Sequence, residues 1–244
     1  MVKKKIRLGV NIDHIATIRN VRKGKDPNII DAIKVLKKTE IDSITVHLRE
    51  DRRHINDDDV VEIKKSKILP LNLEMAATNE MQKICLFIKP FACCIVPERR
   101  EELTTEGGLN VKDQMNHLKK IILPIIKIKT RLSLFVDPDK TQIKAASELG
   151  VSAVEIHTGQ YAEAFCVNNY KNELNKIKES AEFANKLGLE CHAGHGLNYN
   201  NVTNISSISQ ISELNVGHFL IGQSIFLGLE KSVVRFKNII KNSR

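Results

Sequence analysis

Side chains that can transfer protons recur at regular places along this chain. Seven of its eight histidines lie in or just after a short β-rich run, whereas His117 lies in a stretch of helical period. Two glutamates, Glu74 and Glu155, interrupt runs that are otherwise apolar. Burial of a carboxylate raises its pKa toward the range that is useful for proton transfer. Together with His47 and His195, these glutamates predict general acid–base chemistry in one pocket.

Other catalytic devices are less well supported by the sequence. No lysine stands at the end of a predicted strand, so a Schiff-base nucleophile is not expected. No Cys–His or Ser–His arrangement stands out, which favours a substrate that carries its own nucleophile. His192 and His195 are three residues apart and Asp13 and His14 could lie nearby, but no set of three ligands has a recognised metal spacing. We therefore expect no metal and no catalytic lysine.

The basic residues divide into two kinds. Lys+Arg number 38 against 29 Asp+Glu, a formal charge of +9, and the lysines are dispersed over stretches of helical period as on a solvated surface. Seven arginines instead follow apolar runs in three short segments, where the guanidinium fork suits phosphate or carboxylate. With 3 Tyr and no Trp to stack bases, a nucleic-acid partner is disfavoured. The clustered arginines are Arg19, Arg22, Arg49, Arg52, Arg53, Arg99 and Arg100.

These groups need a scaffold, and the sequence predicts one by alternating β-rich and helix-period segments from end to end. Near-continuous apolar strands between amphipathic helices are typical of a parallel sheet covered by helices. Strands are expected at residues 6–13, 42–48, 71–75, 91–97, 131–136, 152–157, 189–193 and 216–222. Helices are expected near residues 28–39, 57–67, 78–88, 112–129, 138–149, 170–187, 200–211 and 223–240.

Eight such units in 244 residues predict an α/β fold, a single (β/α)8 TIM barrel that forms one domain over residues 1–244. A doubly wound open sheet is the rival, but the first predicted strand is not followed by a GxGxxG turn. In a barrel the active site lies at the carboxyl ends of the strands, and the loops after strands 7 and 8 often bind phosphate. Here those segments read HAGHGL and GHFLIGQS.

Composition and segment pattern also indicate the cellular location of the protein. No apolar run approaches the roughly 20 residues that a membrane span needs. The amino-terminal segment has charges but lacks the apolar stretch of a signal peptide. The five cysteines have no CxxC spacing and are expected in the core. We expect a cytoplasmic protein without a membrane partner.

Several segments together carry a family resemblance, which runs in consistent order from about residue 8 to residue 225. They resemble the pyridoxine 5′-phosphate synthase family of vitamin B6 biosynthesis. The resemblance implies a (β/α)8 barrel that condenses 1-deoxy-D-xylulose 5-phosphate with 3-amino-2-oxopropyl phosphate to pyridoxine 5′-phosphate, phosphate and water. The segments are GVNIDHIATIRN, TVHLREDRRHI, NLEMA, VPERREELTTEGGL, EIHTG, AGHGLNY and LNVGHFLIG.

The same resemblance implies roles for particular residues. It implies catalytic bases at His47 and Glu74, a proton donor at His195 and charge stabilisation by Glu155. It also implies a homo-octamer that acts on two small phosphorylated substrates without a metal or an organic cofactor. Contacts to deoxyxylulose phosphate are implied for Asp13, His14, Arg49, His54 and Thr104. Contacts to the aminoketone phosphate are implied for Asn11, Arg22, Gly196, Gly217 and His218.

The sequence departs from the family pattern at a few positions. The family usually has Asn at the position of His192 and Arg at that of Gln223, so both departures are expected to affect phosphate affinity. A different turn at residues 38–42 is not expected to affect chemistry. Two alternatives stay open: another phosphosugar barrel, such as an isomerase or epimerase with paired carboxylates, and a basic nucleic-acid-binding module.

Overall fold

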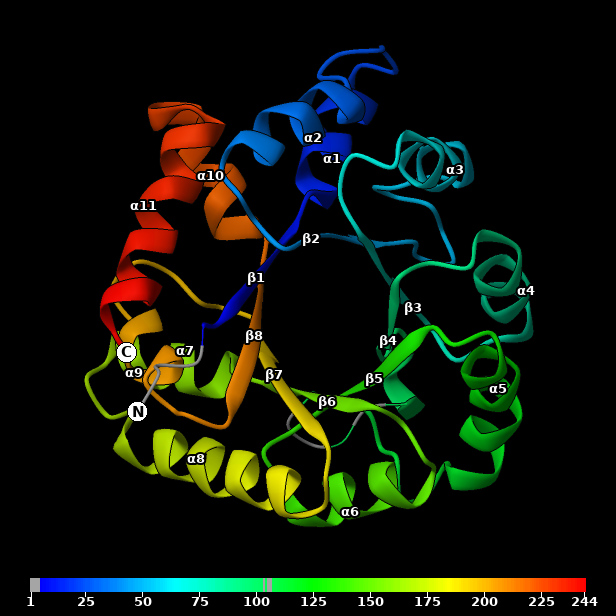
Figure 1. The fold of residues 1–244 in the computed structure, drawn as a ribbon, viewed down its shortest axis with the longest axis vertical. Helices are drawn as coiled ribbons and strands as arrows, with labels where there is room; N and C mark the ends of the chain where they lie inside the picture. The colour runs from blue at the N-terminus through cyan, green and yellow to red at the C-terminus, as the bar shows by residue number, and fades with distance from the viewer. Residues whose placement is uncertain (1–4, 103, 105–106) are drawn as a thin grey trace.

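Eight parallel strands form a closed barrel in chain order, which confirms the predicted TIM-barrel class (Figure 1). The computed structural model describes residues 5–102, 104 and 107–244, so part of the VPERREELTTEGGL segment lies outside the described residues. The strands are β1 Arg7–Asn11, β2 Ser43–His47, β3 Leu71–Met75, β4 Ala92–Ile95, β5 Arg131–Val136, β6 Ala153–His157, β7 Glu190–Gly194 and β8 Ile211–Val216.

Helices surround this barrel, as the ribbon in Figure 1 shows. No helix among the described residues is long and apolar enough to cross a membrane. The helices are α1 Asp13–Val21, α2 Ile29–Lys38, α3 Asp57–Ser66, α4 Asn79–Ile88, α5 Met115–Lys127, α6 Lys140–Glu148, α7 Gly159–Cys166, α8 Lys171–Lys186, α9 Val202–Ser206, α10 His218–Leu227 and α11 Leu229–Asn242, with a 3-10 turn η1 at Arg100–Glu102.

Strand alternation divides the buried residues into two layers. In β2, Ile44 and Val46 are fully buried and belong to the apolar core, whereas Thr45 and His47 alternate with them on the other face. Helix starts are fixed locally. For example, the Asn56 side chain and Asp59 at the start of α3 form a reciprocal capping box. The apolar layer between strands and helices therefore holds the barrel rigid, and the inner face is left for polar groups.

The barrel interior is more polar than the sequence led us to expect. Glu155 pairs in register with His192 on β7, and His192 pairs with Glu213 on β8, so the three residues share the inner face. Branched apolar residues usually fill this space in TIM barrels. The expectation of near-continuous apolar strands is therefore wrong for the inner face. Its polar residues include Arg7, Thr45, Asn72, Arg131, Glu155, Glu190, His192, Glu213 and Asn215.

The last strand is the main error of the sequence-based prediction. A strand was expected at residues 216–222, but β8 spans Ile211–Val216 and the helix α10 begins at His218. The inward side chains of Glu213 and Asn215 interrupt the apolar run of β8, so residues 212–215 fell outside every predicted element. Consequently GHFLIGQS is the start of a helix and not a loop, and residues 200–211 contain only the short α9. Two short helices, α1 and α7, were not predicted at all.

Candidate functional site

A cavity of about 1090 Å³ opens at the carboxyl ends of the strands and brings together most of the predicted site residues. The described residues that line it include no lysine, as the strand ends indicated. The predicted residues in its wall are Asn11, Asp13, His14, His47, Arg49, Glu74, Glu155, His195, Gly196, Gly217 and His218.

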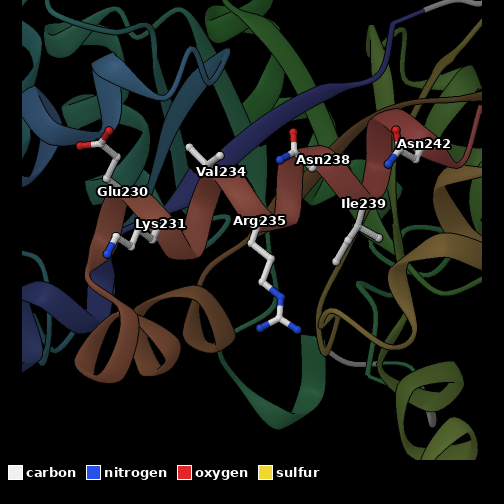
Figure 2. Close-up of a pocket in the computed structure, with 7 residues that line it drawn as sticks. All are labelled: Glu230, Lys231, Val234, Arg235, Asn238, Ile239 and Asn242. Atoms are coloured by element: carbon white, nitrogen blue, oxygen red, sulfur yellow. The ribbon is translucent and has the colours of Figure 1, made fainter.

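Another hollow, of about 590 Å³, runs along the outer helix α11 (Figure 2). All the residues that line it come from that one helix. Its Arg235 packs its guanidinium 4.3 Å above the ring of Tyr199. Because no groups from several elements converge there, this hollow has the character of a helix surface, and the barrel mouth is the candidate active site.

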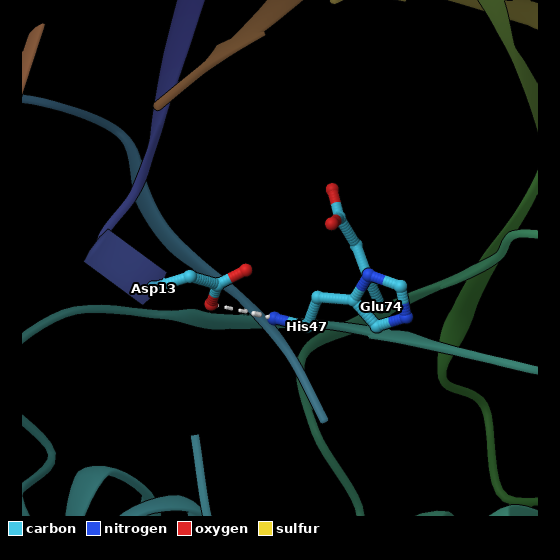
Figure 3. A group of neighbouring side chains, drawn as sticks. All are labelled: Asp13, His47 and Glu74. Atoms are coloured by element: carbon cyan, nitrogen blue, oxygen red, sulfur yellow. Dashed lines mark hydrogen bonds between the residues drawn. The ribbon is translucent and has the colours of Figure 1, made fainter. Parts of the chain in front are cut away.

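Asp13, His47 and Glu74 gather at the ends of three successive segments of the barrel (Figure 3). The His47 N–H donates to Asp13 Oδ1 at 2.9 Å, and His47 Nε2 lies 2.9 Å from Glu98 Oε1. One potential ligand atom from each of Asp13, His47 and Glu74 lies within 4.8 Å of the others, so these residues could in principle hold a metal ion. The bond to Asp13 comes from the backbone of His47 and fixes the end of β2, whereas the Glu98 contact orients the imidazole ring, as a catalytic base requires.

Asn11 connects two of the carboxylates in this cluster. Its Nδ2 donates to Asp13 Oδ2 at 3.1 Å and to Glu74 Oε2 at 3.4 Å. Its Oδ1 accepts the Asp13 N–H at 2.9 Å, which fixes the orientation of the amide. Burial raises the pKa of Asp13, although the His47 N–H and the Asn11 amide act in the opposite direction. Asn11 thus bridges two acidic groups that would otherwise repel each other.

Glu74 and Glu155 are the carboxylates best suited to exchange protons. Burial, followed by the charges of Glu155 and Asp13, raises the pKa of Glu74 well above its usual value. Burial also raises the pKa of Glu155 to about 7, although His192 and a 2.7 Å hydrogen bond from Asn215 lower it. A Cβ at residue 194 would lie 2.5 Å from Glu155 Oε1, so Gly194 leaves the space that this carboxylate occupies.

One side of the cavity holds histidines and an arginine, and two of their ring or guanidinium nitrogens have no hydrogen-bond partner among the described residues. The rings of His14 and His218 meet edge to face with centroids 4.6 Å apart. Burial and then the charge of His218 lower the pKa of His14. His14 Nδ1 and Arg49 Nε are buried without a hydrogen-bond partner among the described residues. Buried donors of this kind normally have a partner, so this region can accept an anionic group from a ligand.

The loop after β7 places its residues with an unusual backbone. His195 has φ +85° and Gly196 has φ +73°, and a left-handed conformation is uncommon for a histidine. The Thr158 hydroxyl donates to the His195 carbonyl at 2.6 Å, which fixes the turn. Burial, and then the charge of His157, lower the pKa of His195. This turn directs the histidine into the cavity.

Three predicted contact residues do not line the cavity. Arg22 is exposed at the end of α1. His54 lies behind His14, with ring centroids 5.6 Å apart, and its Nδ1 is 2.7 Å from Thr17 Oγ1. Thr104 donates its hydroxyl to Asp137, which in turn contacts the cavity residue His157.

The interpretation of the clustered arginines is largely wrong. Of those whose side chains the structure describes, only Arg49 lines the cavity. Four others pair with acidic residues of the protein, two with a carboxylate that is near in sequence and two with a carboxylate about 40 to 50 residues away. These pairs are Arg19–Asp59, Arg52–Asp57, Arg53–Asp51 and Arg99–Glu50.

The expected position of His192 is also wrong, whereas Gln223 does line the cavity. His192 points into the barrel, with Nε2 3.7 Å from Glu190 and Nδ1 3.9 Å from Glu213. Sequence reasoning gave no role to Glu98 or Asp137, which hold His47 and His157. Both are acidic residues that follow a strand, and this position is the feature of the sequence that could have indicated their role.

Comparisons with known proteins agree with this architecture. A family model described as "Pyridoxal phosphate biosynthesis protein PdxJ" matches residues 8–242. A protein of Zymomonas mobilis named pyridoxine 5′-phosphate synthase is 51% identical over 242 residues, covering 99% of this chain and 94% of the relative. A protein of the same name from Rhodospirillum rubrum is 50% identical over 232 residues, covering 95% of this chain and 93% of the relative.

Solved structures of low identity share the fold alone. One titled "Native KDPGal structure" has a TM-score of 0.66 at 11% identity and covers 98% of this chain and 97% of its own. A 3-keto-L-gulonate-6-phosphate decarboxylase from Vibrio cholerae has a TM-score of 0.65 at 12% identity, with 99% and 100% covered.

Proposed function

Because the chain belongs to the pyridoxine 5′-phosphate synthase family, whose members are enzymes, we propose that it condenses 1-deoxy-D-xylulose 5-phosphate with 3-amino-2-oxopropyl phosphate. The products are pyridoxine 5′-phosphate, inorganic phosphate and water. The observation that carries the proposal is one cavity in which buried carboxyl groups of raised pKa face unpartnered cationic donors. Proton-transfer groups and an anion site are what a condensation of two phosphorylated substrates needs.

The substrates supply the nucleophile in this chemistry. The amine of the aminoketone adds to the carbonyl of deoxyxylulose phosphate and forms an imine with loss of water. Enolisation, loss of phosphate, addition and loss of water and ring closure follow, and each of these steps requires a proton to be added or removed. His47 and Glu74 act as bases, Glu155 stabilises developing positive charge, and His195 donates a proton. A cavity wall without lysine is consistent with this sequence of steps.

The two substrates occupy different parts of the cavity. Deoxyxylulose phosphate binds to Asp13, His14 and Arg49 in the cavity wall. Arg49 Nε has no hydrogen-bond partner among the described residues, so it can donate to an anionic oxygen. The aminoketone phosphate binds to Asn11, Gly196, Gly217 and His218 in the cavity wall, whereas Arg22 lies outside this wall. Gly217 precedes the first turn of α10, and the free N–H groups of a helix N-terminus favour a phosphate. Gln223 on the same helix can donate hydrogen bonds to it but supplies no positive charge.

In this scheme, substrate binding favours the protonated form of His195. In the empty cavity burial lowers the pKa of His195, so the ring is mainly neutral at pH 7. Two phosphorylated substrates bring negative charge into the cavity, which favours the imidazolium form. The donor is thus charged only when there is a substrate to receive the proton.

We also propose a cytoplasmic homo-oligomer, an octamer as in the family, that uses neither a metal nor an organic cofactor and binds neither nucleic acid nor membrane. Support for association comes from Ile225 and Phe226 at the cavity rim, which are 70% and 82% exposed. Ile18 and Val21 of the neighbouring helix α1 are exposed as well. Exposed apolar patches of this kind favour protein–protein contact.

The direct test is an assay of the purified protein with both substrates, monitored for pyridoxine 5′-phosphate and for inorganic phosphate. We expect the two products in equal amounts, and neither when one substrate is omitted. Isomerisation of a single sugar phosphate without either product would show that another phosphosugar enzyme uses this barrel. Steeply salt-dependent binding of nucleic acid that substrate does not displace would favour the nucleic-acid alternative.

A further inference from the structure

A pair of residues outside the predicted site lies directly behind His195. Asp137 follows β5 and His157 ends β6, and His157 Nδ1 lies 3.1 Å from Asp137 Oδ1. The side chain of His157 is 11% exposed and that of Asp137 is 5% exposed. Asp137 stays ionised because His157 and the Thr104 hydroxyl lower its pKa, although burial alone would raise it. An ionised carboxylate only accepts hydrogen bonds, so the contact places a proton on His157 Nδ1.

The His157 ring also packs against the ring of His195. The two ring centroids are 4.9 Å apart with an interplanar angle of 66°. A Cβ at residue 159 would lie 2.5 Å from His157 Nε2 and 3.1 Å from His195 Cδ2, so Gly159 leaves room for both rings. Both rings line the cavity. The backbone of His195, the glycine and the ring of His157 together restrict the orientation of the His195 ring.

Asp137 also connects this pair to the loop after β4. Its Oδ2 accepts the Thr104 hydroxyl and the Gly108 N–H, the latter at 2.9 Å. A Cβ at residue 108 would lie 2.2 Å from the Asp137 nitrogen, so the close approach requires glycine. One carboxylate therefore fixes the tautomer of His157 and the position of the Thr104 hydroxyl at the same time.

We propose that Asp137 and His157 are positioning residues for the proton donor His195: Asp137 fixes His157 as the Nδ1–H tautomer, and His157 orients the His195 ring and modulates its charge. The proposal rests on the role of His195 in the proposed function. The electrostatic effect of His157 on the pKa of His195 has a definite direction. His157 lowers the pKa of His195 and Glu163 of α7 raises it, while Asp137 faces His157 from β5.

The main test is His157→Asn. The asparagine Nδ2 can still donate to Asp137, but the edge that contacts His195 is lost. We expect kcat to fall roughly 10-fold, part of what an acid–base group contributes, with little change in either KM. NMR titration of the substrate-free protein should show His195 protonating at higher pH than in wild type. Glu163→Gln is the matched control, because it should shift the same titration to lower pH.

A second pair of measurements keeps the proposal falsifiable if His157→Asn does not fold. His157→Gln places an amide near the Nε2 position, where it can still contact His195, so it should retain more of kcat than the asparagine variant. The ring-nitrogen chemical shifts of the wild-type protein should show His157 as the Nδ1–H tautomer.

Two outcomes would overturn the proposal. One is a folded His157→Asn protein with wild-type kcat and an unshifted His195 titration, and the other is the Nε2–H tautomer in wild type. The titration and the tautomer need no turnover. Failure of the proposed function in the two-substrate assay is thus distinguishable from failure of this inference.

Discussion

Both ends of this barrel are polar, but the polar groups are arranged in opposite ways. At the amino-terminal end, Glu213 accepts hydrogen bonds from Arg7 at 2.7 Å and Arg131 at 2.8 Å, and Glu190 pairs with Arg7. At the carboxyl end, the one hydrogen bond to the Glu74 side chain from the described residues is a 3.4 Å contact from Asn11. One end thus satisfies its charges internally and the other leaves them incompletely paired.

The pKa directions express this difference. His192, Arg131 and Arg7 lower the pKa of Glu213 although burial opposes them, whereas burial raises the pKa of Glu74 and of Glu155. Paired charges in a protein interior specify structure, and unpaired ones whose pKa is perturbed mark sites of chemistry. We therefore assign stability to the amino-terminal network and catalysis to the carboxyl end.

The largest expected effect is on stability, from Glu213→Gln. The Glu213 side chain is 1% exposed, and its loss leaves Arg7 and Arg131 with the more exposed Glu190 as their remaining carboxylate among the described residues. Breaking a buried pair in this way should lower the free energy of unfolding by roughly 3–5 kcal/mol. Urea denaturation at one fixed protein concentration measures it. Glu190→Gln is the control: its side chain is 30% exposed, so we expect a loss of about 1 kcal/mol or less. Equal losses in the two variants would contradict the account.

For Glu74→Gln we expect the opposite pattern, a large loss of activity without a loss of stability. The amide keeps the shape but cannot accept a proton, so kcat should fall by roughly 10²-fold or more. Stability should not fall, because burial and the charges of Glu155 and Asp13 already disfavour the ionised form of the carboxyl group that the amide replaces. Steady-state kinetics with both substrates and thermal unfolding measure the two effects. Glu148→Gln, on the exposed end of α6, should change neither.

A smaller effect is expected from Arg49→Lys, which keeps the charge and removes the guanidinium fork. The KM for deoxyxylulose phosphate should rise by roughly 10-fold, equivalent to about 1.4 kcal/mol, with little change in unfolding. The exposed Arg53 pairs with Asp51, and Arg53→Lys should leave KM unaltered. An unchanged KM in Arg49→Lys would remove this residue from the anion site.

The smallest effect concerns the pH dependence of stability, which should have opposite sign at the two ends. The folded-state pKa of Glu155 is about 7, raised from 4.5, so its contribution to stability is present below pH 4.5 and is lost as the pH rises to 7. The pKa of Glu213 is lowered, so its contribution is present above the ordinary carboxyl range and is lost in acid.

Glu155→Gln should therefore flatten the decline of the melting temperature between pH 4.5 and 7. Glu213→Gln should instead flatten the acid limb. The same pH dependence in both variants would mean that the two carboxylates do not differ as proposed.

The sequence predicted the fold better than the site. Alternating segments located seven of the eight strands, and β8 was misplaced because Glu213 and Asn215 point into the barrel. Polar residues at strand ends identified Glu74 and His47, since the carboxyl ends of all the strands meet at one edge. Pairing across the fold is not encoded in local spacing. No pattern around Arg19 indicates that Asp59 neutralises it, or that Asp137 holds His157.

The most direct test compares turnover per folded molecule in wild type, Glu74→Gln and Glu213→Gln, under conditions in which all three are folded. The account predicts that wild type releases pyridoxine 5′-phosphate and phosphate together. It predicts that Glu74→Gln loses roughly 10²-fold of this activity and that Glu213→Gln loses far less. A folded Glu213→Gln protein as inactive as Glu74→Gln, or a Glu74→Gln protein as active as wild type, would contradict it.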